Sequence, residues 1–593
     1  MTVHRFWPEP DRTHGSKGYF LEFLRAAGYP VPAFRVLDRD GVAAVEDLRT
    51  RVTEFATAIA TEAAGQQGIP ADSVSFAVRS SGQRSMPGMM DTVLCVGLTE
   101  TNLSALEARL GSTQAAFDAL INATRDFCVL VGGVDPLLVH AASASSEDGP
   151  SQVASMRALF ETSTGIVFPL DPAEQLAMAV EAVVASWGSV RARSYRDRHA
   201  IPDAAGPCVV IQAMIHGTAE LTSGSGVVFS HDPLTGERRM TGEYVERSTG
   251  EGIVSGTVTP LDVSTLQAAD VAVFAELEHL VERLHQNLTR MVEIEFVVER
   301  NVLWLVQVRP AVGDAQVTNA IAIDSWRSGM IETDEMFRRL SADALFSSTS
   351  ARTYRGGGRL LGTGIPASNG VASGIVVVDM AEAAVCVGED IVLLRETTEP
   401  RDFPAMVSSV ALVTLTGGAS SHAAVVAREL GIPAVVGVTF NDLQWLESAT
   451  GARVTVFGTT GEVWLGDIET EVAGTDDFPH AILDGAHTRT AIVGSLREIE
   501  ARGAEILRTN DLALGISAGP EIVVATTDTE LAEQRTAVGG RVAFLCSEGP
   551  PMQRWRAVLP AHPTEYVVPA DEVQVPYIRV RLLVEAAHRE DYL

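Results

Sequence analysis

The segment 411–433 constrains the local path of the chain more than any other part of the sequence. An apolar run, ALVTLT, is followed by Gly417 and Gly418. These two residues allow a tight turn because glycine tolerates backbone conformations that other residues rarely adopt. The letters SHAAVVAREL then have helical spacing, and the letters GIP end them. The segment predicts a buried strand, a tight turn and a helix at 421–430, a combination typical of mixed α and β folds.

His422 lies at the start of this predicted helix. Unpaired backbone N–H groups and the helix dipole favour an anion there and disfavour a charged imidazole. A neutral imidazole nitrogen is a good nucleophile for phosphorus, and a phosphohistidine would be an anion where anions are stabilised. We interpret His422 as a nucleophile that carries phosphoryl groups. The alternative is a histidine that only packs at a helix start.

Charge and composition exclude several classes of partner. The 593 residues, enough for about three to five domains, include 45 basic and 76 acidic side chains, which give a net charge of −31. Such an acidic chain has no general attraction for nucleic acids or anionic membranes. We find no membrane-length apolar run, no signal peptide and no CxxC pair among the five cysteines. A cytoplasmic protein is therefore expected.

The chain contains a single lysine, Lys17, within the sequence GSKG. It falls at the start of a predicted amphipathic helix, 16–29. A lone lysine among 45 basic residues suggests a position where a compact ammonium group is needed and a guanidinium group is unsuitable. The alternative is a surface lysine that remains by chance.

Hydrophobic patterns divide the chain into several parts. The predicted parts are a mixed unit at 1–346 with subdomains at about 1–200 and 201–346, a polar linker at 347–361, a β/α domain at 362–470 and a C-terminal domain at 475–593. The fold class is therefore α+β and α/β, with several domains.

Two strands near residue 300 bring polar side chains together. The letters EIEFVVE (293–299) and LWLVQVR (303–309) predict a β-hairpin. Because strand side chains alternate, Glu293 and Glu295 share one face, and the next strand presents Gln307 and Arg309 in the same way. Two carboxylates and an amide oxygen suit Mg²⁺, and the arginine would balance phosphate charge. The alternative is an exposed polar strand face.

Several motifs resemble a known family. Residues 416–437 resemble the phosphohistidine signature of the phosphoenolpyruvate-utilising enzymes, and RSSGQRSMPGMMDTVLCVGL (79–98) is similar to the nucleotide domain of the pyruvate phosphate dikinases. Three further motifs appear in the same order, GSKGYFLEFLRAAGYPVPAF, SGSGVVFSHDPLTGE and RETTEPRDF. The resemblance covers about residues 10–470. It implies an ATP-grasp-like nucleotide-binding domain, a swivelling phosphohistidine domain and a small C-terminal α/β domain.

The resemblance also implies roles for individual residues. The positions that match ATP contacts are Lys17, Arg79, Arg125, Gln212, Glu243 and Arg309. The loop over the terminal phosphates contains Ser85, Gly88 and Asp91. The positions that match Mg²⁺ ligands are Glu293, Glu295 and Gln307. The family normally has aspartate at the first of these three positions. The predicted cofactor is Mg²⁺ with ATP.

The resemblance implies an ATP-dependent phosphotransferase of the dikinase type. His422 would attack ATP, AMP would leave, and inorganic phosphate would take the terminal phosphoryl group. The linker 347–361 would let the histidine domain swivel to an acceptor. Two alternatives stay open: a phosphotransferase for a drug or another small molecule in place of pyruvate, and a non-catalytic regulatory or partner-binding subunit. Retention of the lysine, arginine, carboxylate and histidine positions argues against the second.

The C-terminal part departs from the family pattern. The family normally ends in a (β/α)₈ barrel that binds phosphoenolpyruvate or pyruvate and needs about 250 residues. Here 119 residues follow residue 474, and we interpret 475–593 as a different or eroded domain in which Cys546 is a candidate catalytic acid. The predicted partners are ATP, phosphate and a small-molecule acceptor, and a separate protein is a further candidate for carrying the acceptor site. No nucleic acid or membrane partner is expected.

Overall fold

The computed structural model describes most of the chain up to residue 468. The described residues are 13–43, 48–84, 86, 88–144, 148–203, 206–219, 222–311, 313–341, 352–354, 358–378, 388–442, 445–446, 448–468, 470–472, 492–493, 505–507, 522–525, 542–545 and 567–568. They fall into two compact units. The first comprises Met1–Asp314 and Tyr354–Glu469, and the second comprises Ala315–Thr353 and Thr470–Leu593. The mixed α and β fold class is confirmed, whereas the domain boundaries predicted from sequence stay predictions.

The first sheet has four antiparallel strands. Their order is β1 (Phe34–Leu37), β4 (Cys208–Ala213), β2 (Phe76–Ser81) and β3 (Thr92–Val96). The long helices α3 (Leu48–Gln67) and α8 (Pro172–Ala185) share an apolar core with it. This core fixes the end of β4, where one wall of a cavity begins.

The second sheet has five antiparallel strands. Their order is β7 (Leu261–Asp262), β6 (Thr241–Glu246), β5 (Gly224–Phe229), β8 (Val292–Glu299) and β9 (Val302–Pro310). Helices α1 (Gly15–Ala26) and α12 (Val271–Leu288) pack against it in one core. The predicted hairpin is present, and Arg300 and Asn301 form its turn with φ values of 53° and 66°. Positive φ at both residues is what a two-residue hairpin turn needs.

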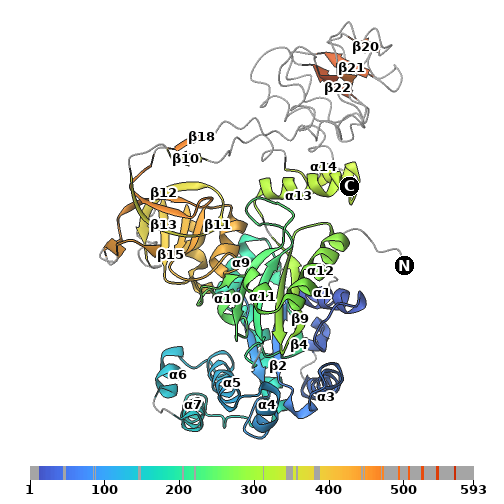
Figure 1. Cartoon of the computed structure of the whole chain (residues 1–593), viewed down its shortest axis with the longest axis vertical. Helices are drawn as coiled ribbons and strands as arrows, with labels where there is room; N and C mark the ends of the chain where they lie inside the picture. Colours follow the sequence, from blue (N-terminus) through green and yellow to red (C-terminus); the bar gives the residue numbers. More distant parts are fainter. Residues whose placement is uncertain are drawn as a thin grey trace. The chain divides into compact units, whose positions relative to one another are not determined.

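Helices fill most of the remaining N-terminal part. Four helices that share their own apolar core lie at one end of the first sheet (Figure 1). They are α4 (Leu103–Leu110), α5 (Thr113–Asp126), α6 (Pro136–Ser143) and α7 (Gly149–Thr164). The other short helices are α2 (Arg39–Ala43), α9 (Val190–Arg198), α10 (Glu251–Ser255) and α11 (Ser264–Ala269).

The histidine-bearing part is a closed seven-stranded barrel. Around the barrel the strands are β11 (Arg359–Ser368), β15 (Ala434–Phe440), β14 (Ala411–Thr414), β13 (Ile391–Arg395), β12 (Val371–Val377), β16 (Arg453–Phe457) and β17 (Glu462–Leu465). Strands β12 to β15 run parallel, and the other neighbours are antiparallel. Helices α17 (Phe403–Ser408) and α18 (His422–Leu430) pack with this part.

Strand β11 closes this barrel, and the sequence reasoning missed it. It begins inside the predicted linker 347–361. Its letters RLLGTGIPAS contain two glycines and a proline, which weaken any strand pattern. The glycines are needed because a Cβ at Gly362 or Gly364 would lie within 3 Å of a backbone oxygen of β15. The barrel therefore depends on a strand whose composition resembles that of a loop.

Among its described residues, the second unit contains two helices and several short strands. The helices are α13 (Ala315–Arg327) and α14 (Thr333–Arg339). The strands are the pair β10 (Arg352–Tyr354) and β18 (Thr470–Val472), the parallel pair β19 (Ile492–Val493) and β23 (Val567–Val568), and the parallel sheet β20 (Glu505–Leu507), β21 (Ile522–Ala525) and β22 (Val542–Leu545). Cys546 lies outside the described residues. Among the described helices of both units, none combines the length and the apolar character needed to cross a membrane.

Candidate active site

Strands from both sheets and loops of the barrel surround a cavity of about 400 Å³ in the first unit. One part of its wall is apolar and includes Leu94, Met214, Ile215, Phe296 and Val306. The other part carries charged and polar side chains, Lys17, Arg79, Gln212, Glu295, Gln307, Arg309 and His422. With Gly88, eight of the residues predicted from sequence therefore lie around one space, which apolar and charged side chains line together.

The start of α1 places Lys17 in this cavity. Gly15 has a φ of 65°, and a Cβ there would collide with the carbonyl oxygen of Ser81. The N–H of Ser16 donates to the carbonyl oxygen of Gly82 at 2.7 Å, which fixes the first turn against β2. Burial and the neighbouring Arg79 cation lower the pKa of Lys17 to about 7. The ammonium group is therefore costly to hold in the cavity without an anion beside it.

Arg79 joins the two sheets across the cavity. Its Nη2 atom lies 2.7 Å from Glu295 Oε2, and its Nη1 atom donates to the carbonyl oxygen of Val306 at 2.9 Å. The same Nη1 atom lies 3.4 Å from Oε1 of Gln212, whose buried Nε2 atom has no hydrogen-bond partner in the described structure. Three residues predicted to bind ATP or a metal ion are thus in direct contact.

The predicted polar strand face forms across β8 and β9. Glu293 pairs with Arg309 and Glu295 pairs with Gln307 in the strand register. Glu293 Oε1 accepts from Nε of Arg309 at 2.9 Å and from Nη2 at 2.6 Å, and Gln307 Nε2 donates to Glu295 at 2.7 Å. Burial acts to raise the pKa of Glu295, but the cations of Arg79, Arg309 and Lys17 lower it. The carboxylate is therefore ionised.

The same face can be tested as a metal site. Gln307 Oε1 is buried and accepts no hydrogen bond in the described structure. Glu295 and Gln307 line the cavity, whereas Glu293 lies beside it and is held by Arg309. Within the described ranges, no three carboxylate, imidazole or thiolate side chains gather around one point. A metal ion here would need Gln307 and ligand oxygens to complete its coordination.

The predicted phosphate loop lies partly in the cavity. Gly88 lines the cavity, whereas Asp91 forms an ion pair with Arg191. Arg191 also donates to the carbonyl oxygen of Met89 at 3.1 Å. Asp91 therefore anchors the loop in this structure. Ser85 lies outside the described residues.

His422 is the first residue of α18, as the sequence predicts. Only 6% of the residue is exposed, it lines the cavity, and neither ring nitrogen has a hydrogen-bond partner in the described structure. Burial lowers the pKa of His422 to about 4 against the opposing charge of Asp402, and the cations of Arg309 and Arg191 lower it further. A neutral imidazole with free nitrogens therefore faces the cationic part of the cavity.

The structure places Glu243, on strand β6, in contact with the loop before His422 and outside the cavity lining. Its carboxylate accepts hydrogen bonds from the N–H of Ala419 and from both the N–H and the hydroxyl of Ser420. A Cβ at Gly418 would collide with this carboxylate, which explains the glycine there. Burial raises the pKa of Glu243. The predicted ATP contact thus attaches the loop before His422 to strand β6.

Arg125 also lies outside the cavity lining. Its Nη1 atom donates to Asn122 Oδ1 at 2.6 Å in α5. Its positive charge acts on Glu251, which does line the cavity. Burial and the charge of Glu251 raise the pKa of the adjacent Asp126 to about 7. The contribution of Arg125 to the cavity is therefore electrostatic and indirect.

Some cavity residues were missed from sequence. Thr397 and Thr398 line the cavity, and Asp402 acts electrostatically on His422. All three belong to the motif RETTEPRDF, which resembles the family but predicts no role for any single residue. Glu251 follows a glycine at the start of α10 and gave no signal of its own. A carboxylate at a helix start is common because the helix dipole stabilises its negative charge, so Glu251 does not stand out in the sequence.

Sequence comparisons match two parts of the chain to known domain families. Residues 42–273 match the pyruvate phosphate dikinase AMP/ATP-binding domain, and residues 387–461 match the mobile domain of the PEP-utilising enzymes. The chain belongs to the pyruvate phosphate dikinase and PEP-utilising enzyme family. Of the cavity residues, Arg79 and Gln212 fall in the first family domain and His422 falls in the second.

Several curated members of this family are similar to the chain. It is 32% identical to pyruvate, phosphate dikinase of Rhizobium meliloti (strain 1021) over 504 residues, which cover 77% of this chain and 56% of that protein. It is 31% identical to the Clostridium symbiosum dikinase, with 77% and 57% covered. For dikinase 1 of Arabidopsis thaliana the identity is 29%, with 88% and 59% covered. The chain spans just over half the length of these relatives.

Proposed function

We propose that the chain is an ATP-dependent phosphotransferase of the dikinase type, in which His422 carries the phosphoryl group. The observation that supports this most directly is the neutral imidazole of His422, which faces the same cavity as Lys17, Arg79 and Arg309. The cationic side chains suit a triphosphate, and the apolar wall suits a nucleobase. The cavity thus combines a binding site for the nucleotide, cations for its phosphates and a nucleophile, which are the groups that phosphoryl transfer requires.

The proposed reaction has two transfers on the histidine. The imidazole nitrogen of His422 forms a bond to the β-phosphorus of ATP, and the bond from that phosphorus to the oxygen of the α-phosphate breaks, so AMP leaves. An oxygen of inorganic phosphate then forms a bond to the terminal phosphorus, and the bond from that phosphorus to the bridging oxygen breaks. Pyrophosphate leaves, and one phosphoryl group stays on His422. Lys17, Arg79 and Arg309 would stabilise the negative charge of the transferring groups. The phosphoryl group then passes to a small-molecule acceptor.

Mg²⁺ is the proposed cofactor with ATP. Glu295 and Gln307 would hold the ion, because both line the cavity and Gln307 Oε1 has no other partner in the described structure. Glu293 would join them if its carboxylate turned away from Arg309. When bound, the ion neutralises phosphate charge and orients the phosphate oxygens.

We also propose the family's domain roles for this chain. Residues 1–346 would form the ATP-grasp-like nucleotide domain, and 362–470 would swivel as the phosphohistidine domain about 347–361. The hydrogen bonds of Glu243 to the loop before His422 support a docked position in which the histidine faces ATP. The role of 475–593 stays a prediction of a small C-terminal domain.

The test is to identify the products. The chain is incubated with Mg²⁺, phosphate and ATP labelled in the β-phosphate, and the nucleotides and the protein are then separated. We expect AMP as the nucleotide product and label on the protein that is labile to acid and stable to base. Formation of ADP without labelled protein would contradict the proposal and indicate an ordinary kinase.

A further inference from the structure

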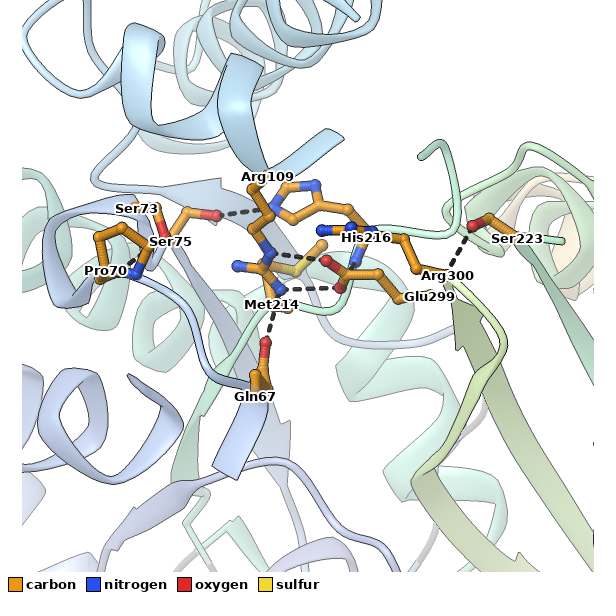
Figure 2. Close-up of polar contacts among 10 residues, drawn as sticks. All are labelled: Gln67, Pro70, Ser73, Ser75, Arg109, Met214, His216, Ser223, Glu299 and Arg300. Atoms are coloured by element: carbon orange, nitrogen blue, oxygen red, sulfur yellow. Dashed lines mark hydrogen bonds and ion pairs between the residues drawn. The ribbon is translucent and has the colours of Figure 1, made fainter. Parts of the chain in front are cut away.

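A buried ion pair lies behind the apolar wall of the cavity. Arg109 of α4 and Glu299, the last residue of β8, meet with Nε 2.6 Å from Oε1 and Nη2 2.8 Å from Oε2. The side chain of Arg109 has no exposed surface, and neither residue lines the cavity. Figure 2 shows Arg109 between Glu299, Met214 and Gln67, whose Oε1 atom accepts from Nη2 at 2.8 Å. Three separate elements thus fix the guanidinium group.

This pair holds the segment 213–216, which begins at the last residue of β4 and contributes three residues to the cavity wall. Arg109 Nη2 donates to the carbonyl oxygen of Met214 at 3.0 Å. Glu299 Oε2 accepts from the N–H of His216 at 2.9 Å. The charged pair, which does not line the cavity, therefore binds one acceptor and one donor of the segment.

The hydrogen bonds of the segment leave one donor for a ligand. The N–H of Ala213 donates to Ala33 at 2.8 Å, and that of Met214 donates to Ser75 at 2.9 Å. With His216 bound to Glu299, Ile215 is the one residue of the four whose N–H has no partner in the described structure. Buried N–H groups are nearly always paired, so a free one in a cavity wall indicates a ligand contact.

We propose that Arg109 and Glu299 are positioning residues for base selection, which rests on the proposed function of this cavity. They bind the Met214 carbonyl and the His216 N–H, which leaves the Ile215 N–H as the free donor for the base. Atom N1 of a 6-aminopurine has a lone pair and accepts this hydrogen bond. Atom N1 of a 6-oxopurine carries a hydrogen and leaves the donor unpaired. The pair therefore favours ATP over inosine triphosphate, although it contacts neither.

The test measures base-dependent affinity separately from phosphate-dependent affinity. Calorimetry with Mg²⁺ gives the Kd of ATP, inosine triphosphate and inorganic tripolyphosphate for the full chain and for R109M/E299Q. The double variant removes both charges together, because removing one would leave the other buried and unpaired. We expect the affinity for ATP to fall roughly tenfold and that for tripolyphosphate to stay within about twofold. The control is the double variant R157M/E100Q, which removes a more exposed ion pair between α7 and the segment before α4.

A second variant keeps the test valid if the double variant fails to fold. Arg109→Lys keeps a positive charge beside Glu299, but one ammonium group cannot bind the carboxylate and the Met214 carbonyl as the planar fork does. The same selective loss of ATP affinity is expected, with thermal melting as the check on folding. Equal losses for ATP and tripolyphosphate, or no loss, would overturn the inference. If the wild-type chain binds neither ATP nor tripolyphosphate, the proposed function is overturned as well. If it binds ATP and inosine triphosphate equally well, only the base-selection inference is overturned.

Discussion

We predict that Lys17 takes up a proton when the chain binds Mg-ATP. Burial and Arg79 lower the pKa of Lys17 to about 7 in the free protein. Roughly nine tenths of the Lys17 side chains are then neutral at pH 8. Triphosphate oxygens next to the amine favour its charged form, so binding raises the pKa of Lys17 towards its ordinary value. The expected uptake at pH 8 is about 0.9 proton for each ATP bound.

The sign of the pH dependence follows from this shift. Because the pKa is higher in the bound state than in the free state, the full affinity is present below about pH 7. The affinity then falls as the pH rises, by about tenfold per pH unit, until the pKa of the bound state is reached. Calorimetry at pH 8 in two buffers with different enthalpies of ionisation measures the proton uptake directly.

Lys17→Arg is the control for this prediction. Arginine stays charged over the whole range, so the uptake assigned to Lys17 should disappear and the affinity should depend less on pH. Subtracting the two proteins also removes the contribution of Asp126, whose pKa is about 7. We also expect slower phosphorylation of His422, because the guanidinium group is wider than the ammonium group. Equal proton uptake by Lys17→Arg and the wild type at pH 8 would refute the reasoning.

Three further predictions concern the histidine. His422→Ala should abolish labelling from β-labelled ATP and leave the Kd of ATP within about twofold in calorimetry, and acid-labile label on the variant would remove His422 from the mechanism. Because burial lowers the pKa of His422 to about 4, the rate of labelling should show no fall near pH 6.5, where an ordinary imidazole becomes charged; a rate profile from pH 5.5 to 8 measures this. Glu243→Ala should slow labelling by about tenfold with ATP affinity unchanged, because the loop before His422 loses the carboxyl group that accepts its hydrogen bonds. Glu246→Ala, an exposed change on the same strand, should label at the normal rate.

Local features of the fold could be predicted from sequence. The helix that begins at His422 follows from a glycine turn and a terminating GIP, all within about 20 residues. The hairpin of β8 and β9 follows from two apolar runs separated by Arg300 and Asn301. Such features depend on neighbouring residues, whose backbone preferences are visible in the sequence. Strand β11 was missed because its pairing partners, and not its composition, determine its structure.

The pairing of charged residues could not be predicted. The sequence shows many carboxylates and arginines, but it does not show which of them meet. Glu243 contacts a loop 176 residues away, and Arg109 contacts a carboxylate 190 residues away. The family resemblance suggested a nucleotide contact for Glu243, and nothing in the sequence suggested a role for Arg109. Because these roles depend on tertiary contacts, the site residues stay predictions until their variants are measured.

The ion pairs of the cavity can be replaced by ion pairs with a bound ligand. Arg79 is held by Glu295, and Arg309 is held by Glu293, so the carboxylates offset both guanidinium groups. Lys17 forms no ion pair within the described part of the chain, and its low pKa keeps much of it neutral. A triphosphate that arrives with its metal ion presents anions to the arginines and a cation to the carboxylates. Each buried ion pair can then be replaced by another pair of opposite charges. No buried charge is left unpaired, and an unpaired buried charge is the costly state inside a protein. The proton taken up by Lys17 supplies positive charge that this exchange does not, which is why proton uptake is the sharpest test of the cavity's proposed ligand.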